Sequence, residues 1–476
     1  MPPYSPERRT ALVLTGTGAH GAYHAGALRA LQEAGVKIDL VAGHGVGAGG
    51  AALAAIDGGA RLWDADGIWR SPGITTMYGW RRPLHLVTWL GAVLVAVLLI
   101  PLLVLLVGLL IFLIGFFLEM IQVSQGASII SAFSAWLQTA FAGTGLPTLV
   151  PRAATIVLVA IIGVLASSAF MAARAGGSRR MQGGWWWRMA GAPLDARAAS
   201  DRFADALWEL IRGAASITRP GRVALGRRFS EVLVDNLGQP GFRELLLVAT
   251  DLDARRDVVA ALLTDPHRQE FLAPRVDVDR RSEVLDLTGV GRDHAFDMIA
   301  AALTPPVVSD PHLLTFASDS FWRGETHRLC DRPGALQRLL EEVAAAGVRQ
   351  VVMVSGIAPA AAPHRLRAAR VDLRGRCGDF QAAAEAVALR DAIEATRVFF
   401  ESIYVIQPAH NAVGPYDLGG AYDEGSDRVM HVPELAERAY EDTYRQFIEP
   451  VVGASGEQIA RRAGPAVRVG ADASRR

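Results

Sequence analysis

The stretch VAGHGVGAGG, residues 41–50, has the spacing of a tight strand-to-helix turn that carries a catalytic nucleophile. In a G-x-S-x-G turn the central serine attacks an acyl carbonyl, but this chain has Gly45 at that place. The turn consists of Gly43, His44, Gly45, Val46 and Gly47. The sequence therefore predicts a nucleophile turn that lacks its nucleophile.

A second glycine-rich turn precedes this one. It consists of Gly16, Thr17, Gly18, Ala19, His20 and Gly21. The glycines allow backbone N–H groups to converge ahead of a helix amino terminus, where they stabilise a developing negative charge. The same G-x-G-x-x-G spacing is compatible with a dinucleotide-binding turn, although no P-loop lysine follows it.

Each turn is expected to join a buried strand to a helix. TALVLTG precedes the first turn and GAYHAGALRALQEAG follows it with apolar residues at helical spacing. IDLVA precedes the second turn and AGGAALAAI follows it. The second unit, with its nucleophile-turn spacing, favours an acyl-transfer fold over a dinucleotide fold.

With these motifs the chain resembles the patatin-like phospholipase family. That family has a G-G-G-x-R-G loop, a G-x-S-x-G turn about two dozen residues further on, and a later D-G-G or D-G-A. The resemblance implies a three-layer α/β/α domain, with residues 16–21 as the oxyanion loop. It also implies that Asp319, in FASDSF, is the aspartate of a serine–aspartate dyad.

Three positions depart from the family pattern. Gly45 replaces the serine, His20 replaces the loop arginine, and Asp319 is followed by Ser320 and Phe321 instead of glycines. Loss of such a nucleophile typically costs ~10⁶ in turnover. We therefore expect a protein that binds acyl lipid, or a protein partner, and hydrolyses esters poorly or not at all.

Two other functions stay open on the sequence alone. One is an active lipid acyl hydrolase with a displaced nucleophile, although Thr15 and Thr17 are better explained as turn residues. The other is a membrane scaffold whose soluble domain has no chemical role. Balanced charge, with 48 basic and 48 acidic residues, gives no field that would attract nucleic acid. No cofactor and no metal site is expected, since Cys330 and Cys377 lack metal-ligand spacing.

Two uncharged stretches predict membrane spans. Leu86–Leu118 and Ala153–Ala173 both exceed the ~18 residues that a span requires. The first stretch is too long for one straight span, so a tilt or a kink at Pro101 is expected. Arginines flank the pair on the outside, whereas the connector carries only two charges; the flanking arginines are Arg81, Arg82, Arg174, Arg179 and Arg180. The positive-inside rule then places the soluble domain in the cytoplasm and makes the chain a two-span membrane protein.

The predicted organisation is one patatin-like domain interrupted by a transmembrane hairpin. Residues 10–83 and 175–450 form the domain, 84–174 the hairpin, and 451–476 a disordered tail. Membrane lipids are the expected partners. The use of arginine with Lys37 as the sole lysine suggests a bacterial source. A basic cluster at residues 365–376 either contacts anionic headgroups or forms a solvated face.

Overall fold

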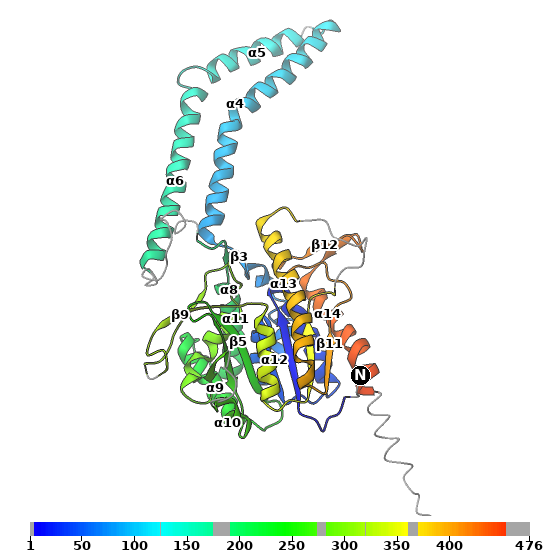
Figure 1. Ribbon diagram of the computed structural model, residues 1–476. Helices are drawn as coiled ribbons and strands as arrows, with labels where there is room; N and C mark the ends of the chain where they lie inside the picture. Colours follow the sequence, from blue (N-terminus) through cyan, green and yellow to red (C-terminus); the bar gives the residue numbers. More distant parts are fainter. Residues whose placement is uncertain are drawn as a thin grey trace, which may run out of the picture. The chain divides into compact units, whose positions relative to one another are not determined.

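A computed structural model describes residues 4–123, 125–174, 191–273, 282–318, 320–359 and 370–453. The chain divides into two compact units (Figure 1). The first consists of Met1–Gly79 with Leu194–Arg476, and the second of Trp80–Pro193. The second unit contains the segment 84–174 in which the hairpin is predicted, and also residues 80–83 and 175–193, which the prediction gave to the domain. The rest of the two flanking segments belongs to the first unit.

A nine-stranded sheet forms the centre of the first unit, with the order β11-β10-β1-β2-β5-β6-β7 and with β9 pairing β5 and β8. The strands are β1 (Thr10–Gly16), β2 (Leu40–Gly45), β5 (Glu244–Asp251), β6 (Arg256–Leu262), β7 (Ser282–Asp286), β8 (His312–Thr315), β9 (Thr326–Cys330), β10 (Gln350–Ser355) and β11 (Ser402–Ile406). β11, β10, β1, β2 and β5 run parallel, whereas β5 pairs antiparallel with β6 and β9. The carboxyl ends of β1, β2 and β10 therefore meet at one edge of the sheet, which we call the carboxyl edge.

Helices cover both faces of this sheet. Alternate residues of β1 enter different cores: Leu12 and Leu14 pack in one cluster, Ala11 and Val13 in the other. The first core includes residues of α1 (Gly21–Glu33), α2 (Gly47–Ala55), α8 (Arg197–Arg212), α9 (Arg222–Asn236), α11 (Ala295–Ala302) and α14 (Val432–Thr443). The second includes residues of α10 (His267–Leu272), α12 (Ala335–Ala345) and α13 (Leu373–Thr396). This arrangement is a three-layer α/β/α fold with a central, largely parallel sheet.

Short elements complete the first unit. They are α3 (Ala60–Trp63), the pairs β3 (Gly79–Trp80) with β4 (Leu194–Asp195) and β12 (Ala421–Asp423) with β13 (Arg428–Met430), and the 3-10 or π helices η1 (Gly18–His20), η2 (Pro72–Thr76), η3 (Val290–His294), η4 (Arg397–Phe399) and η5 (Tyr444–Gly453). The tail predicted from residue 451 begins too early, because Val451 and Val452 end η5 and pack against the core. The rest of that tail lies outside the described residues.

The second unit contains α4 (Arg82–Met120), α5 (Gln125–Ala140) and α6 (Leu146–Arg174). Arg82–Met120 and Leu146–Met171 are long and apolar enough to cross a membrane. Pro101 lies inside α4, where it removes a backbone hydrogen bond, and Figure 1 shows α4 bending partway along its length. Further along, Phe112 of α4 stacks edge-on against Phe133 of α5 with ring centroids 6.2 Å apart.

Candidate functional site

The predicted strand–turn–helix that carries Gly45 is confirmed, since β2 ends at Gly45 and α2 begins at Gly47. Gly45 has φ +59°, a conformation that favours glycine. A side chain at this position would place its Cβ 2.3 Å from the carbonyl oxygen of Gly16 and 3.2 Å from Oδ2 of Asp331. The backbone at Gly45 therefore lies so close to Gly16 of the neighbouring strand that no Cβ atom fits between them.

Asp331 is the carboxylate beside this glycine. It follows β9 directly, its side chain is 1% exposed, and its backbone N–H donates to the carbonyl of Thr304 at 2.8 Å. Oδ2 accepts a hydrogen bond from the Thr17 hydroxyl at 3.2 Å. A carboxylate at this place would accept the proton of a serine at position 45. The predicted dyad aspartate, Asp319, lies outside the described residues, and its role stays a prediction.

His44 links Asp331 to the central strands. Its Nε2 lies 3.1 Å from Asp331 Oδ1 and 2.9 Å from the carbonyl oxygen of Arg332, while its Nδ1 lies 3.0 Å from the hydroxyl of Thr15. Thr15 is the cross-strand neighbour of His44 in the β1–β2 register. Burial disfavours a charge on His44, but the attraction of Asp331 and the hydrogen bonds outweigh it and raise the pKa of His44 to about 9. His44 is therefore protonated at neutral pH, with its Nε2 beside the carboxyl group of Asp331.

The glycine-rich loop packs on the turn, but several of its N–H groups are already occupied. Ala19 N–H donates to Pro415 O at 2.8 Å, and His20 N–H donates to Thr17 O at 3.3 Å. The N–H of Val46, directly after Gly45, donates to Gly16 O at 2.7 Å. An oxyanion at position 45 could use these three donors only after they had left their present acceptors.

A second buried carboxylate, Glu385 of α13, reaches the same loop. It accepts hydrogen bonds from Thr17 and, at 3.1 Å, from Gln381 Nε2. Its other oxygen lies 3.7 Å from Nδ1 of His20. Burial raises the pKa of Glu385, but His20 and Thr17 together outweigh burial, so its pKa lies below the ordinary value. His20, at the place of the family's loop arginine, thus pairs with a carboxylate that the sequence did not indicate.

The structure brings the predicted loop and turn residues Thr17, His20, His44 and Gly45 into one buried cluster. Sequence reasoning missed Asp331 and Glu385. A signal existed for Asp331, because it directly follows the strand THRLC, and strand ends carry many functional side chains. The sequence carried no comparable signal for Glu385, because it is one of several acidic residues in an alanine-rich helix.

Neither the cysteines nor a metal-ligand cluster adds a second reactive centre among the described residues. Burial raises the pKa of the Cys330 thiol to about 12, so little nucleophilic thiolate exists at neutral pH. Both cysteines are free. In the described parts of the chain, no group of three or more His, Cys, Asp or Glu side chains could hold a metal ion.

The chain has a three-layer α/β/α fold with a largely parallel sheet. A nucleophile-type turn lies beside a glycine-rich loop, as in folds that perform acyl transfer. A family model described as patatin-like phospholipase matches residues 12–372, and the chain belongs to this family. The solved structure of VipD from Legionella pneumophila is similar at 12% identity and a TM-score of 0.30, over 94% of this chain and 67% of VipD. No match was found among curated proteins.

Proposed function

We propose that this chain is a membrane-anchored, patatin-like protein that binds acyl lipid at the cytoplasmic face and is impaired in ester hydrolysis. One observation carries the catalytic part of the proposal. Gly45 occupies the nucleophile position, and Asp331, 3.2 Å from where a Cβ would stand, is already bonded to Thr17 and paired with His44. The family reaction needs a hydroxyl at position 45 and a carboxylate free to take its proton.

Anchoring rests on the two long apolar helices and on the arginines that flank them. Lipid binding rests on membership of a family of lipid acyl hydrolases. The turn at Gly45 is closed to solvent, since the neighbouring residues Thr17, Asp331 and Glu385 are all less than 4% exposed. Because Glu385 of α13 and Pro415 hold the glycine-rich loop beside Gly45, we expect these segments to move when an acyl chain enters.

The test combines a covalent probe with a lipid crosslinker on the full chain in liposomes. We expect no fluorophosphonate labelling and no ester turnover above background, while a phospholipid with a photoreactive acyl chain crosslinks to peptides of the first unit. Labelling that Asp331→Asn abolishes would show a recruited nucleophile instead. Crosslinks confined to α4 and α6 would favour the scaffold function.

A second candidate, an active hydrolase with a displaced nucleophile, has one specific observation in its favour. The hydroxyl of Thr17 lies 3.2 Å from Asp331 Oδ2, the geometry of a nucleophile and its base. Thr17 oxygen would attack the ester carbonyl, Asp331 would take its proton and return it to the leaving alkoxide, and water would then hydrolyse the acyl-threonine. Thr17→Val should abolish any measured turnover if this function is real. Thr15→Val, on the neighbouring hydroxyl that contacts His44, is the matched control.

A further inference from the structure

The carboxyl edge of the first unit exposes apolar side chains around the points where the chain leaves for α4 and returns from α6. From this we propose that the edge is a membrane-docking surface, made of Val307, Val371, Leu373 and Phe380, which inserts into the headgroup–acyl boundary of a bilayer. The proposal rests on the membrane anchoring described under the proposed function. It adds which part of the first unit enters the bilayer surface.

The exposure of these residues is the first argument. Val307 is 92% exposed, Val371 83% and Phe380 75%. Single exposed apolar residues are common, but a group at one edge marks an interaction site. Val307 also has φ +68°, which a β-branched residue adopts only as an outlier, and such strain clusters at functional positions.

The two faces of α13 are the second argument. Its buried face carries Gln381 and Glu385, which bond Thr17 in the loop beside Gly45. Its outer face presents Leu373 and Phe380, seven residues apart and both exposed. The first turns of this outer face therefore combine two apolar side chains with the charges of Arg376 and Asp379, a composition that suits the boundary between headgroups and acyl chains.

The position of the surface is the third argument, and it rests on contacts within the first unit. Tyr78, at the exit of the chain towards α4, packs on Tyr416 with ring centroids 5.9 Å apart. A Cβ on Gly378 of α13 would lie 3.5 Å from the ring of Tyr416. At the return point, Leu194 N–H donates to Val308 O at 2.8 Å, directly after Val307. Contacts within the first unit therefore bring the first turns of α13 and Val307 to the residues that lead into α4 and follow α6.

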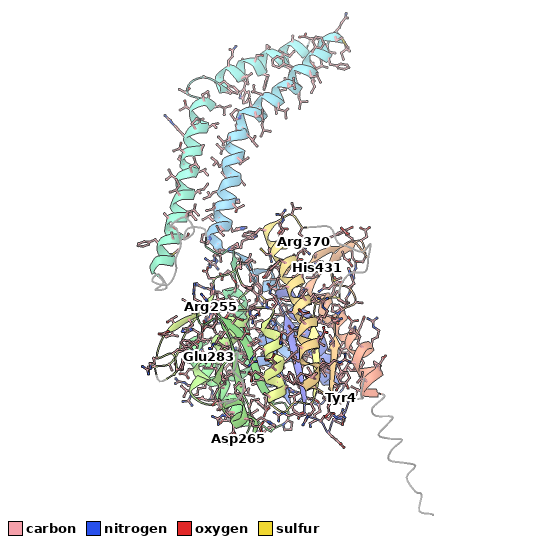
Figure 2. The ribbon with its side chains drawn as sticks, viewed as in Figure 1. Tyr4, Arg255, Asp265, Glu283, Arg370 and His431 are labelled. Atoms are coloured by element: carbon pink, nitrogen blue, oxygen red, sulfur yellow. The ribbon has the colours of Figure 1, made fainter. Side chains whose placement is uncertain are left out.

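Arginines lie beside the apolar surface, where their positive charge would attract anionic lipid headgroups. Arg376, on the outer face of α13, is exposed, and its Nε donates to Arg370 O at 3.3 Å. The Arg370 guanidinium is paired with Asp417, so Arg376 supplies the more available positive charge. Figure 2 shows Arg370 at this end of the first unit, with Asp265 and Tyr4 at the other end.

The experiment uses the full chain with Cys377→Ala, in liposomes that contain anionic phospholipid and a quencher attached to an acyl chain. An environment-sensitive fluorophore is placed on one new cysteine at a time. Phe380→Cys tests the surface. Val398→Cys is the matched control: Val398 is 82% exposed and lies just beyond the other end of α13, next to Glu401, whose N–H bonds Arg349 ahead of β10. Leu98→Cys in α4 reports whether the helices are inserted.

We expect the label at position 98 to be strongly quenched and the label at position 380 to lose about half its emission, as at an interfacial site, while position 398 keeps its emission. Quenching at 98 with equal emission from 380 and 398 would overturn the docking surface and leave the anchoring intact. In that case a protein partner or a second copy would be the better occupant. Absence of quenching at 98 would instead refute the anchoring itself.

Discussion

Gly45→Ser tests whether the turn could still hold a nucleophile. In a family member that has the serine, a hydroxyl at this place is the attacking group. In this chain the new Cβ would lie 2.3 Å from Gly16 O, a backbone atom that itself accepts the N–H of Val46 at 2.7 Å. We therefore expect Gly45→Ser to destabilise the protein without creating a serine that reacts with fluorophosphonate.

The magnitude follows from two costs. The φ of +59° costs a non-glycine residue ~1–3 kcal/mol. Forcing an extra atom against a fixed backbone costs a further ~1–3 kcal/mol, as in other overpacked sites. Together the two costs are large against the ~5–15 kcal/mol of free energy that typically holds a domain folded.

The assay is thermal denaturation in detergent, with Gly35→Ser as the control variant. Gly35 has φ +63°, close to that of Gly45, but a Cβ there would meet no atom within 4 Å. Gly35→Ser therefore isolates the cost of the backbone conformation. The difference in Tm between the two variants measures the overlap with Gly16 O.

Two results would refute this reasoning. If Gly45→Ser and Gly35→Ser lower Tm equally, the Gly16 carbonyl moves aside at no cost and the turn is not closed. If Gly45→Ser folds and labels with fluorophosphonate, and Asp331→Asn removes the label, the dyad geometry is intact and only the hydroxyl is missing.

Three further outcomes are expected. The folded-state pKa of His44, about 9, is above the unfolded value of 6.5, so the stability that His44 contributes is fully present below about pH 6.5 and is lost as pH rises through 9. The loss is about 3 kcal/mol. In denaturation scans against pH, Asp331→Asn should remove most of this pH-dependent stability. Glu385 has a lowered pKa, so its contribution is present above the unfolded pKa and lost as pH falls through the folded one; Glu385→Gln should flatten the acid side of the same scans. In cells or oriented vesicles, Thr144→Cys, on the exposed connector, should react with an impermeant thiol reagent from outside, whereas Val398→Cys should react only after permeabilisation, and the reverse pattern would contradict the predicted orientation.

The fold was largely accessible from the sequence because periodicity and turn chemistry agree there. The apolar run before Gly16 became β1, and the run before Gly45 became β2, buried on both faces as parallel strands are. Two later apolar runs, within RQVVMVSG and SIYVIQP, form β10 and β11, which lie parallel to β1 on the side away from β2. Local patterns alone fixed these elements.

The site was accessible only in its contiguous part. Residues 16–21 form one contiguous stretch and residues 43–47 another, and each has a known spacing, so the loop and the turn could be predicted. Asp331 and Glu385 reach Thr17 across 314 and 368 positions of the chain, a juxtaposition that depends on how β9 and α13 pack. No periodicity encodes such contacts.

The contacts of Asp331 and Glu385 show that this site differs from a reactive dyad by more than the missing hydroxyl. A buried carboxylate without a partner costs several kcal/mol, and Asp331 at 1% exposure would be such a group if only the serine were removed. Protonated His44 lies 3.1 Å from Asp331, His20 lies 3.7 Å from Glu385, and the two carboxyl groups share the single proton of the Thr17 hydroxyl. Each pair also fixes a segment that catalysis would need to be free: the turn through His44, the loop through His20, and α13 through Glu385. A serine at position 45 would therefore enter a core in which Asp331 Oδ2 and Glu385 Oε1 already accept hydrogen bonds. Restoring a reactive dyad would require that His44 and the loop release the carboxylate as well.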